Sequence, residues 1–141
     1  MIRSILTLFF MLAIFGMEAQ ACDCGAPGKP LAELDKSNSV FQGEVLTLDQ
    51  EKSDSGHARN LVTFKVETSW KGLADHKKMT VRTATNGAAC GFVFKKGEKY
   101  VVYANLTSKG ELSASLCSRT AALKDADEDL RGLGKGTKPG N

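Results

Sequence analysis

The sequence lacks most of the patterns by which proteins hold metal ions or bind nucleic acids. Its four cysteines include no C-x-x-C pair, and its two histidines, His57 and His76, do not have the spacing of zinc ligands. The net charge is only +3, and the lysines are spread along the chain without an aromatic-plus-basic motif. We therefore expect no resident metal, no cofactor and no nucleic-acid partner.

A catalytic constellation is also absent from the sequence. No nucleophile and base stand out as a set, and no pair of carboxylates does. A Cys/His pair is disfavoured because the cysteines are better used in disulfides, and both histidines lie in polar stretches typical of the surface. The sequence predicts that the protein is not an enzyme.

Long hydrophobic runs are missing except at the start of the chain. Residues 1–21 are typical of a secretory signal peptide: Arg3 is the positive start, Ile5 to Met17 is apolar, and Ala19-Gln20-Ala21 is a small-x-small cleavage signal. The apolar run is shorter than the roughly 20 residues that span a bilayer. We expect a secreted protein, extracellular or periplasmic, whose first residue is Cys22. Acylation of Cys22, which would anchor the protein to a membrane, is the alternative.

What remains after this cut is a chain of the size of one domain. All four cysteines lie in it, which favours two disulfides in an oxidising compartment. Four cysteines allow three connectivities, and the residues alone leave all three open.

Alternating hydrophobicity predicts a mainly β domain. Pro30 suits the first position of a short helix from Leu31 to Ser37. Period-two runs predict strands at Val40 to Leu48 and Leu61 to Trp70. Further strands are predicted at Met79 to Thr83, at Tyr100 to Ala104 from its residue types, and at Glu111 to Leu116 after a hairpin turn. Gly43 inside the first run indicates a bulge. Five short strands with helices only at the ends predict a small closed or partly open barrel, because closure removes exposed strand edges.

The segments between and after these strands read differently. The polar stretch Asp49 to Asn60 is expected to be an exposed loop. A final helix is predicted from Ala121 to Arg131, with Thr120 as its cap. Residues 134–141 are rich in Gly, Lys and Pro and are predicted to be a disordered tail.

Short motifs along the chain carry a family resemblance. They are Cys22-x-Cys24, F-x-G-x-V at Phe41 to Val45, W-K-G at Trp70 to Gly72, C-G at Cys90 to Gly91, G-x-x-Y at Gly97 to Tyr100, and Cys117. In this order they resemble the netrin-like module, in particular the N-terminal domain of the tissue inhibitors of metalloproteinases (TIMPs). The resemblance covers residues 22–133 and is to the short, single-domain members. It implies a five-stranded OB-fold barrel with flanking short helices, stapled by disulfides.

The resemblance also implies a function and its residues. The disulfides would be Cys22–Cys90 and Cys24–Cys117. The α-amine and carbonyl oxygen of Cys22 would chelate the catalytic zinc of a target metalloproteinase and displace its water. Cys24 would belong to the same protease-binding segment. Asp23 would point into the pocket beside that zinc, and Ala88 and Ala89 would flank the ridge across the disulfide. The chain would thus be a secreted metalloendopeptidase inhibitor that holds no metal of its own.

Asp23 is a departure from the family, whose members usually have a small hydroxyl residue there. A second function therefore stays open: a secreted or periplasmic OB-fold binding module that inhibits no protease. One added residue before Cys22 would abolish the inhibitory activity and leave the binding module intact.

Overall fold

Strands make up most of the described chain. The computed structural model describes residues 22–72 and 75–140, and the predicted signal peptide at residues 1–21 lies outside the described residues. The strands are β1 (Ser39–Lys52), β2 (Ala58–Lys71), β3 (Lys78–Ala84), β4 (Lys99–Leu106), β5 (Leu112–Ser113) and β6 (Ala121–Ala122). The helices are α2 (Pro30–Lys36) and α3 (Asp127–Leu133), with 3-10 turns η1 (Gly87–Ala89) and η2 (Leu123–Asp125). None of the described helices is long and apolar enough to cross a membrane.

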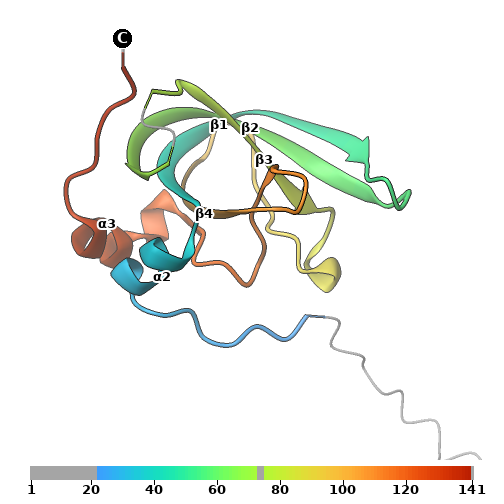
Figure 1. Ribbon diagram of the computed structural model, residues 1–141, viewed down its shortest axis with the longest axis horizontal. Helices are drawn as coiled ribbons and strands as arrows, with labels where there is room; N and C mark the ends of the chain where they lie inside the picture. Colours follow the sequence, from blue (N-terminus) through green and yellow to red (C-terminus); the bar gives the residue numbers. More distant parts are fainter. Residues whose placement is uncertain (1–21, 73–74, 141) are drawn as a thin grey trace, which may run out of the picture.

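Five of the strands form a ring. Their order is β1-β2-β3-β5-β4, and a further pairing between β4 and β1 closes it, while β6 adds to β4 outside the ring. All neighbours in the ring are antiparallel except β3 and β5, which are parallel. The two helices lie together beside one end of the ring (Figure 1). The prediction of a mainly β domain with two short flanking helices is confirmed.

The bend in β1 allows the ring to close. β1 pairs with β2 from Val40 to Lys52 and with β4 from Ser39 to Glu44. Its register against β2 shifts at three places, one of them between Gln42 and Gly43. A Cβ on Gly43 would lie 2.9 Å from the backbone oxygen of Lys65, so the close approach of β2 at the bend excludes a side chain there. The predicted irregularity therefore lies beside Gly43, but the extra residue there is Glu67 on β2, because Gln42 pairs with Thr68 and Gly43 with Val66.

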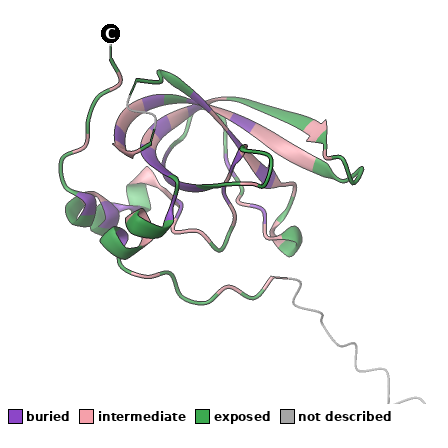
Figure 2. Ribbon diagram, in the orientation of Figure 1, coloured by how far each residue is buried: buried purple, intermediate pink, exposed green. Residues whose placement is uncertain are grey.

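The main core fills the inside of the ring. The inward-facing residues of β1 to β4 are buried (Figure 2), and at its centre four aromatic rings pack edge to face in a row. The centroid distances are 5.4 Å for Phe41–Phe64, 5.2 Å for Phe64–Phe94 and 4.9 Å for Phe94–Tyr100. Edge-to-face pairs stabilise a core beyond the area they bury, by about 0.5–1.5 kcal/mol each.

A second core lies between the ring and the helices. Val40, Val101 and Tyr103 pack with Ala126 and Leu133 there, all buried. α2 and α3 approach so closely that a Cβ on Gly132 would meet Pro30 Cγ at 2.7 Å. Lys71 donates to the carbonyl oxygens of Leu34 and Asp35 at 2.9 and 2.8 Å, which satisfies acceptors at the end of α2. The helices are thereby fixed on the outer face of β1 and β4.

The seam between β3 and β5 has the sparsest backbone pairing in the ring. Only Arg82 and Ser113 are paired across it, and Ala114 N–H donates to the Arg82 carbonyl at 3.0 Å. A quartet of alternating charges, Glu51, Arg59, Arg82 and Glu111, spans the seam. Arg82 lies 2.7 Å from Glu51 and 3.2 Å from Glu111, and Arg59 lies 2.8 and 3.0 Å from the same two carboxylates.

These contacts influence the ionisation of Glu51. The hydrogen bond from Arg82, followed by the charges of both arginines, holds the pKa of the Glu51 carboxyl below its usual value.

Two predicted segments of the strand region differ in the structure. The polar stretch 49–60 is mostly strand, because β1 and β2 continue past the ring as a hairpin with the turn at residues 53–57. Polar cross-strand pairs such as Gln50 Nε2 to Asn60 Oδ1, 3.3 Å apart, occupy its exposed faces, so hydrophobic alternation does not mark it. The last predicted strand shortens to Leu112–Ser113.

The C-terminal part also differs from expectation. Ala121 and Ala122 pair with the edge of β4 instead of starting a helix, and α3 begins only at Asp127. Residues 134–140, predicted as a disordered tail, begin next to the end of β2 in space. Ser69 and Thr137 exchange two backbone hydrogen bonds of 2.8 Å, and Trp70 Nε1 donates to the Gly134 carbonyl at 2.8 Å.

Candidate functional site

Two disulfides fix the segment that begins at Cys22. Cys22 is bonded to Cys90 with their Cα atoms 5.3 Å apart, and Cys24 is bonded to Cys117 with their Cα atoms 5.0 Å apart. These are the two pairs that the family resemblance implies. The bridges span 68 and 93 residues, so they join the start of the domain to its second half. In Figure 1 this N-terminal segment runs as an extended chain below the ring towards η1.

A tight turn presents the partner of Cys22. The side chain of Asn86 accepts a hydrogen bond from the Ala89 N–H at 3.0 Å and so caps η1, whose single turn contains Ala88 and Ala89. Cys90 follows in the left-handed region with φ 60°, which is uncommon for a residue with a side chain. Gly91 N–H then donates to the Asn86 carbonyl at 2.8 Å and closes the turn.

A third segment lies beside this turn. Leu116 N–H donates to the Cys90 carbonyl at 2.8 Å, and Gly91 and Ser115 form an antiparallel bridge. Segments 22–24, 86–91 and 115–117 are thus joined to one another by two disulfides and backbone hydrogen bonds. We call this assembly the disulfide edge.

The structure brings the predicted site residues together on the disulfide edge. Asp23, Ala88 and Ala89 are exposed, whereas Cys22 and Cys24 are half-buried at the bridges. The exposed Asp23 follows Cys22, and the exposed Ala88 and Ala89 precede Cys90. The disulfides and the Asn86 cap hold the backbone of both segments in place.

Sequence reasoning missed two exposed apolar side chains, Leu116 within the disulfide edge and Val93 just after it. Val93 is 66% exposed and Leu116 is 49% exposed, and they lie in the segments that leave Cys90 and enter Cys117. Val93 also lines a shallow cavity of about 300 Å³ together with Leu48 and Thr85. The short apolar run from Gly91 to Phe94 was the available signal, but a run of this length does not show which of its side chains faces the core.

The sulfur atoms themselves form a cluster without metal-binding capacity. The Cys22 Sγ lies 3.6 Å from both the Cys24 Sγ and the Cys117 Sγ, and the sulfurs of Cys22, Cys90 and Cys117 lie within 4.8 Å of one another. All four are in disulfides, and metal ligation by cysteine requires the thiolate.

A network of charges holds the other end of the N-terminal segment. Arg119 donates to the Gly28 carbonyl at 2.7 Å, to Glu128 at 2.8 Å and to the buried Asp129 at 2.6 Å. Tyr103 donates to the same Asp129 oxygen at 2.6 Å. Because Arg119 and Tyr103 both pair with this carboxylate, its burial is offset.

The ionisation of Tyr103 follows from this arrangement. Burial raises the pKa of its hydroxyl well above the ordinary range, and the hydrogen bond to the Asp129 carboxylate raises it further. Tyr103 therefore remains a neutral hydrogen-bond donor to Asp129 throughout the physiological pH range. Asp129 in turn pairs with Arg119, which holds the Gly28 end of the N-terminal segment.

The two histidines lie away from the disulfide edge. His57 ends the exposed turn between β1 and β2, and His76 lies in the exposed turn before β3. They come from different turns, and neither lies in one of the three segments of the disulfide edge.

Comparison with protein-family models and with curated protein sequences found no match to this chain.

Proposed function

We propose that this protein is a short, single-domain relative of the TIMPs, with an OB-fold barrel, and that it inhibits a secreted zinc metalloproteinase. The observation that carries the proposal is the disulfide edge. It pins Cys22 to the turn that exposes Ala88 and Ala89, with Asp23 exposed beside it. The closed ring of five strands is consistent with an OB-fold.

The proposed mechanism uses two backbone atoms. Removal of residues 1–21 would free the α-amine of Cys22, which stands next to the carbonyl oxygen of the same residue. Together these atoms would take the open coordination position of the protease zinc and displace the water that attacks the substrate. Only the neutral amine can bind zinc, and an α-amine with a pKa of about 7.7 loses its proton readily near neutral pH.

Rigidity of the segment favours tight binding. The bridges at Cys22 and Cys24 and the Arg119–Gly28 hydrogen bond hold the segment at both ends. A chelating group that is already fixed in place loses little conformational entropy on binding. Val93 and Leu116 extend the exposed surface with apolar area beside the bridges.

Asp23 determines which proteases the site suits. Its exposed carboxylate would enter the pocket next to the zinc, and burial of an unpaired charge is unfavourable. The target pocket therefore carries a cationic or strongly polar group, unlike the apolar pockets of many matrix metalloproteinases.

The decisive experiment compares two forms of the secreted domain, one that starts at Cys22 and one with a single Ala before it. N-terminal sequencing and intact mass establish the start and the absence of acyl chains. We expect the form that starts at Cys22 to inhibit at least one member of a panel of zinc proteases, measured with fluorogenic peptides. The extended form should be weaker by about 100-fold or more, equivalent to about 2.7 kcal/mol.

Variants at Asp23 complete the test. Asp23→Asn keeps the shape and removes the charge, so it should shift inhibition towards enzymes with apolar pockets, while the extended form of the same variant stays weak. Equal inhibition by both start sites, or none across the panel, would contradict the proposal. The protein would then be the non-inhibitory binding module.

A further inference from the structure

The seam leaves part of β3 without a neighbouring strand. β5 has only two residues, because the chain turns away at Gly110, which has φ +75°. Of the residues of β3, only Arg82 is paired with β5. Lys78 and Thr80, nearer the start of β3, have β2 on one side and no strand of the described chain on the other.

Hydrogen-bond alternation shows which way their backbone groups point. Val66 N–H donates to the Lys77 carbonyl at 2.9 Å, so Lys77 faces β2, whereas the Arg82 carbonyl accepts from Ala114 across the seam. In an antiparallel ladder, successive residues of a strand direct their N–H and C=O groups to opposite sides. Lys78 and Thr80, an even number of residues from Arg82, therefore direct theirs away from β2. No backbone partner meets them in the described part of the chain.

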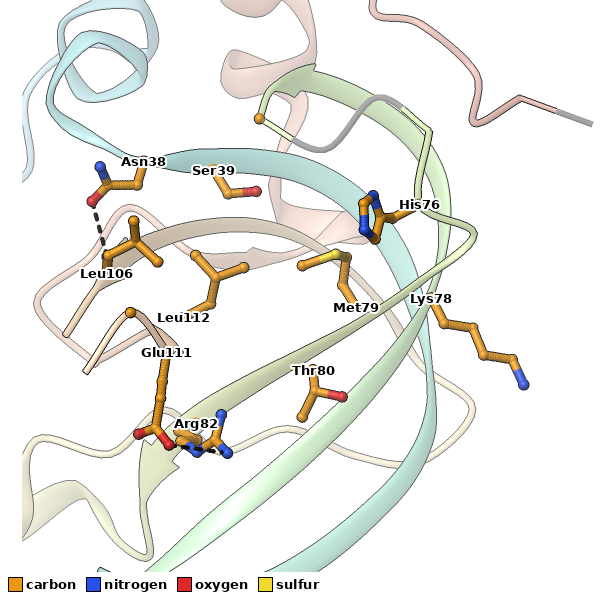
Figure 3. Close-up of a pocket in the computed structure, with 12 residues that line it drawn as sticks. Asn38, Ser39, His76, Lys78, Met79, Thr80, Arg82, Leu106, Glu111 and Leu112 are labelled. Atoms are coloured by element: carbon orange, nitrogen blue, oxygen red, sulfur yellow. Dashed lines mark hydrogen bonds and ion pairs between the residues drawn. The ribbon is translucent and has the colours of Figure 1, made fainter. Parts of the chain in front are cut away.

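A cavity of about 620 Å³ lies along this free edge. Figure 3 shows the side chains of Met79, Leu106 and Leu112 around it, with Ser39 among them. Leu106 is 51% exposed. Ser39 is buried, and among the described residues its Oγ has no hydrogen-bond partner. The volume is within the range of about 300–1,000 Å³ typical of ligand sites.

We propose that an extended peptide segment of a partner protein adds to β3 at this free edge. Its backbone would pair with the N–H and C=O groups of Lys78 and Thr80, which match the two-residue period of a strand. One apolar side chain of the peptide would enter the cavity against Leu106 and Leu112. A polar group beside it would supply the partner that Ser39 Oγ lacks.

Charge indicates the composition of the peptide. Lys78 is exposed and forms no ion pair with the described residues, whereas the charge of Arg82 is offset by Glu51 and Glu111. The segment that fits this edge therefore has an acidic residue next to its apolar one. A second copy of the chain does not fit, because antiparallel pairing of two β3 strands about Thr80 would set Lys78 opposite Arg82, which supplies no carboxylate to pair with it.

This site shares no residue with the disulfide edge, so the inference does not rest on the proposed inhibitory function. The variants that test it leave Cys22, Asp23 and η1 unchanged. Failure of one proposal therefore does not decide the other.

The test selects ligands from a displayed library of random ten-residue peptides against the secreted domain, and the most enriched sequence is synthesised as the probe. We expect enriched sequences to share an apolar residue flanked by Asp or Glu.

Thr80→Pro removes the backbone N–H at the free edge, which takes no part in the hydrogen bonds to β2. It should weaken binding of the probe at least tenfold in calorimetric titration. The matched control Thr80→Val keeps the N–H and should bind within twofold of the wild type. Lys78→Glu should weaken binding severalfold.

Amide hydrogen exchange of the wild-type protein tests the proposal even if Thr80→Pro does not fold. The amides of Lys78 and Thr80 should exchange fast in the free protein and slow at least tenfold with the probe, whereas those of Met79 and Val81 should already be slow. Three results would overturn the proposal: no enrichment over a control surface without protein, equal binding by Thr80→Pro and Thr80→Val, or no added protection at Lys78 and Thr80. A probe that binds only through its apolar side chain would bind Thr80→Pro and Thr80→Val equally and would add no protection at Lys78 and Thr80.

Discussion

The two sides of the ring are held together by different interactions. Between β1 and β2, backbone pairing extends from Val40 to Lys52, and β4 continues it on the other flank of β1. Across the seam, β3 and β5 share a single residue pair. There, side chains take the place of the ladder. The Glu51–Arg59–Arg82–Glu111 quartet spans the seam, and the two disulfides join the segments that follow β3 and β5 to residues 22–24.

The difference shows what the C-x-C motif does for the fold. Cys90 follows β3 and Cys117 follows β5, and both are bonded to the same three-residue segment, Cys22 to Cys24. The motif therefore cross-links the two strands that pair least with each other. Covalent and ionic cross-links are concentrated where hydrogen bonding between strands is sparse.

Removal of a seam disulfide should have the largest effect. In the double variant Cys24→Ala/Cys117→Ala, loss of a cross-link that spans 93 residues should lower the free energy of unfolding by about 4–5 kcal/mol in the chain-entropy model. Urea unfolding measures the loss. Hydrogen exchange should show the Ala114 and Leu116 amides losing protection before those of β1 and β2. Uniform loss of protection over the whole ring would contradict this comparison.

A change on the ladder side should be nearly as large but differently distributed. Phe64→Ala removes a fully buried ring that packs against Phe41 and Phe94, which should cost about 3–4 kcal/mol. Because Phe64 lies at the centre of the core, protection should fall across all strands together. Phe64→Leu, the matched control, should recover much of the loss. A loss confined to the seam in Phe64→Ala would contradict the assignment of this residue to the main core.

The smallest effect should come from the charge quartet and depend on pH. The pKa of Glu51 is lowered from its usual 4.5 by Arg82, so its ionised form favours the folded state. This contribution is complete above the unfolded pKa and is lost as the pH falls through the lower, folded value. Glu51→Gln should therefore be less stable than the wild type at pH 7, and the gap should close below pH 4.5.

Urea midpoints of the two proteins over this range provide the measurement. Glu44→Gln, on the same strand, is the control, because Glu44 forms no ion pair among the residues described and should show no such closing gap. A gap that persists unchanged at low pH would mean that the charge of Glu51 is not its source.

Hydrophobic alternation predicted the parts of the fold that line the main core. The runs beginning at Val40, Leu61 and Met79 lie in strands with a largely alternating burial pattern. The run from Tyr100 to Ala104 also lies in a strand, but all five of its residues are buried, because the main core covers one face and the helices cover the other. The hairpin beyond Leu48 was missed because both of its faces are polar. The short pairing of Ala121 with β4 was missed because it depends on a free edge formed by residues about 20 positions away.

The candidate site was predictable to a similar extent. The position of Cys22 follows from the cleavage signal, but the residues alone left three disulfide pairings open. Exposure of Val93 and Leu116 depends on the turn that Asn86 caps, which no periodicity marks. The free edge of β3 depends on the register against β2 and on the early turn at Gly110, and both are set by tertiary packing.

The order of strands in the ring also determines when it can close during synthesis. By the time Ala84 is made, β1, β2 and β3 are complete, yet the outer edges of β1 and β3 are both still open. β4 covers the edge of β1, β5 pairs with the edge of β3 only at Arg82, and Cys117 follows a few residues later. A growing chain therefore carries two unprotected strand edges from the completion of β3 until β4 is made, the condition in which β-rich chains associate with one another. Lys71 at the end of β2 and Lys78 at the start of β3 are suited to limit such association before the last strands arrive.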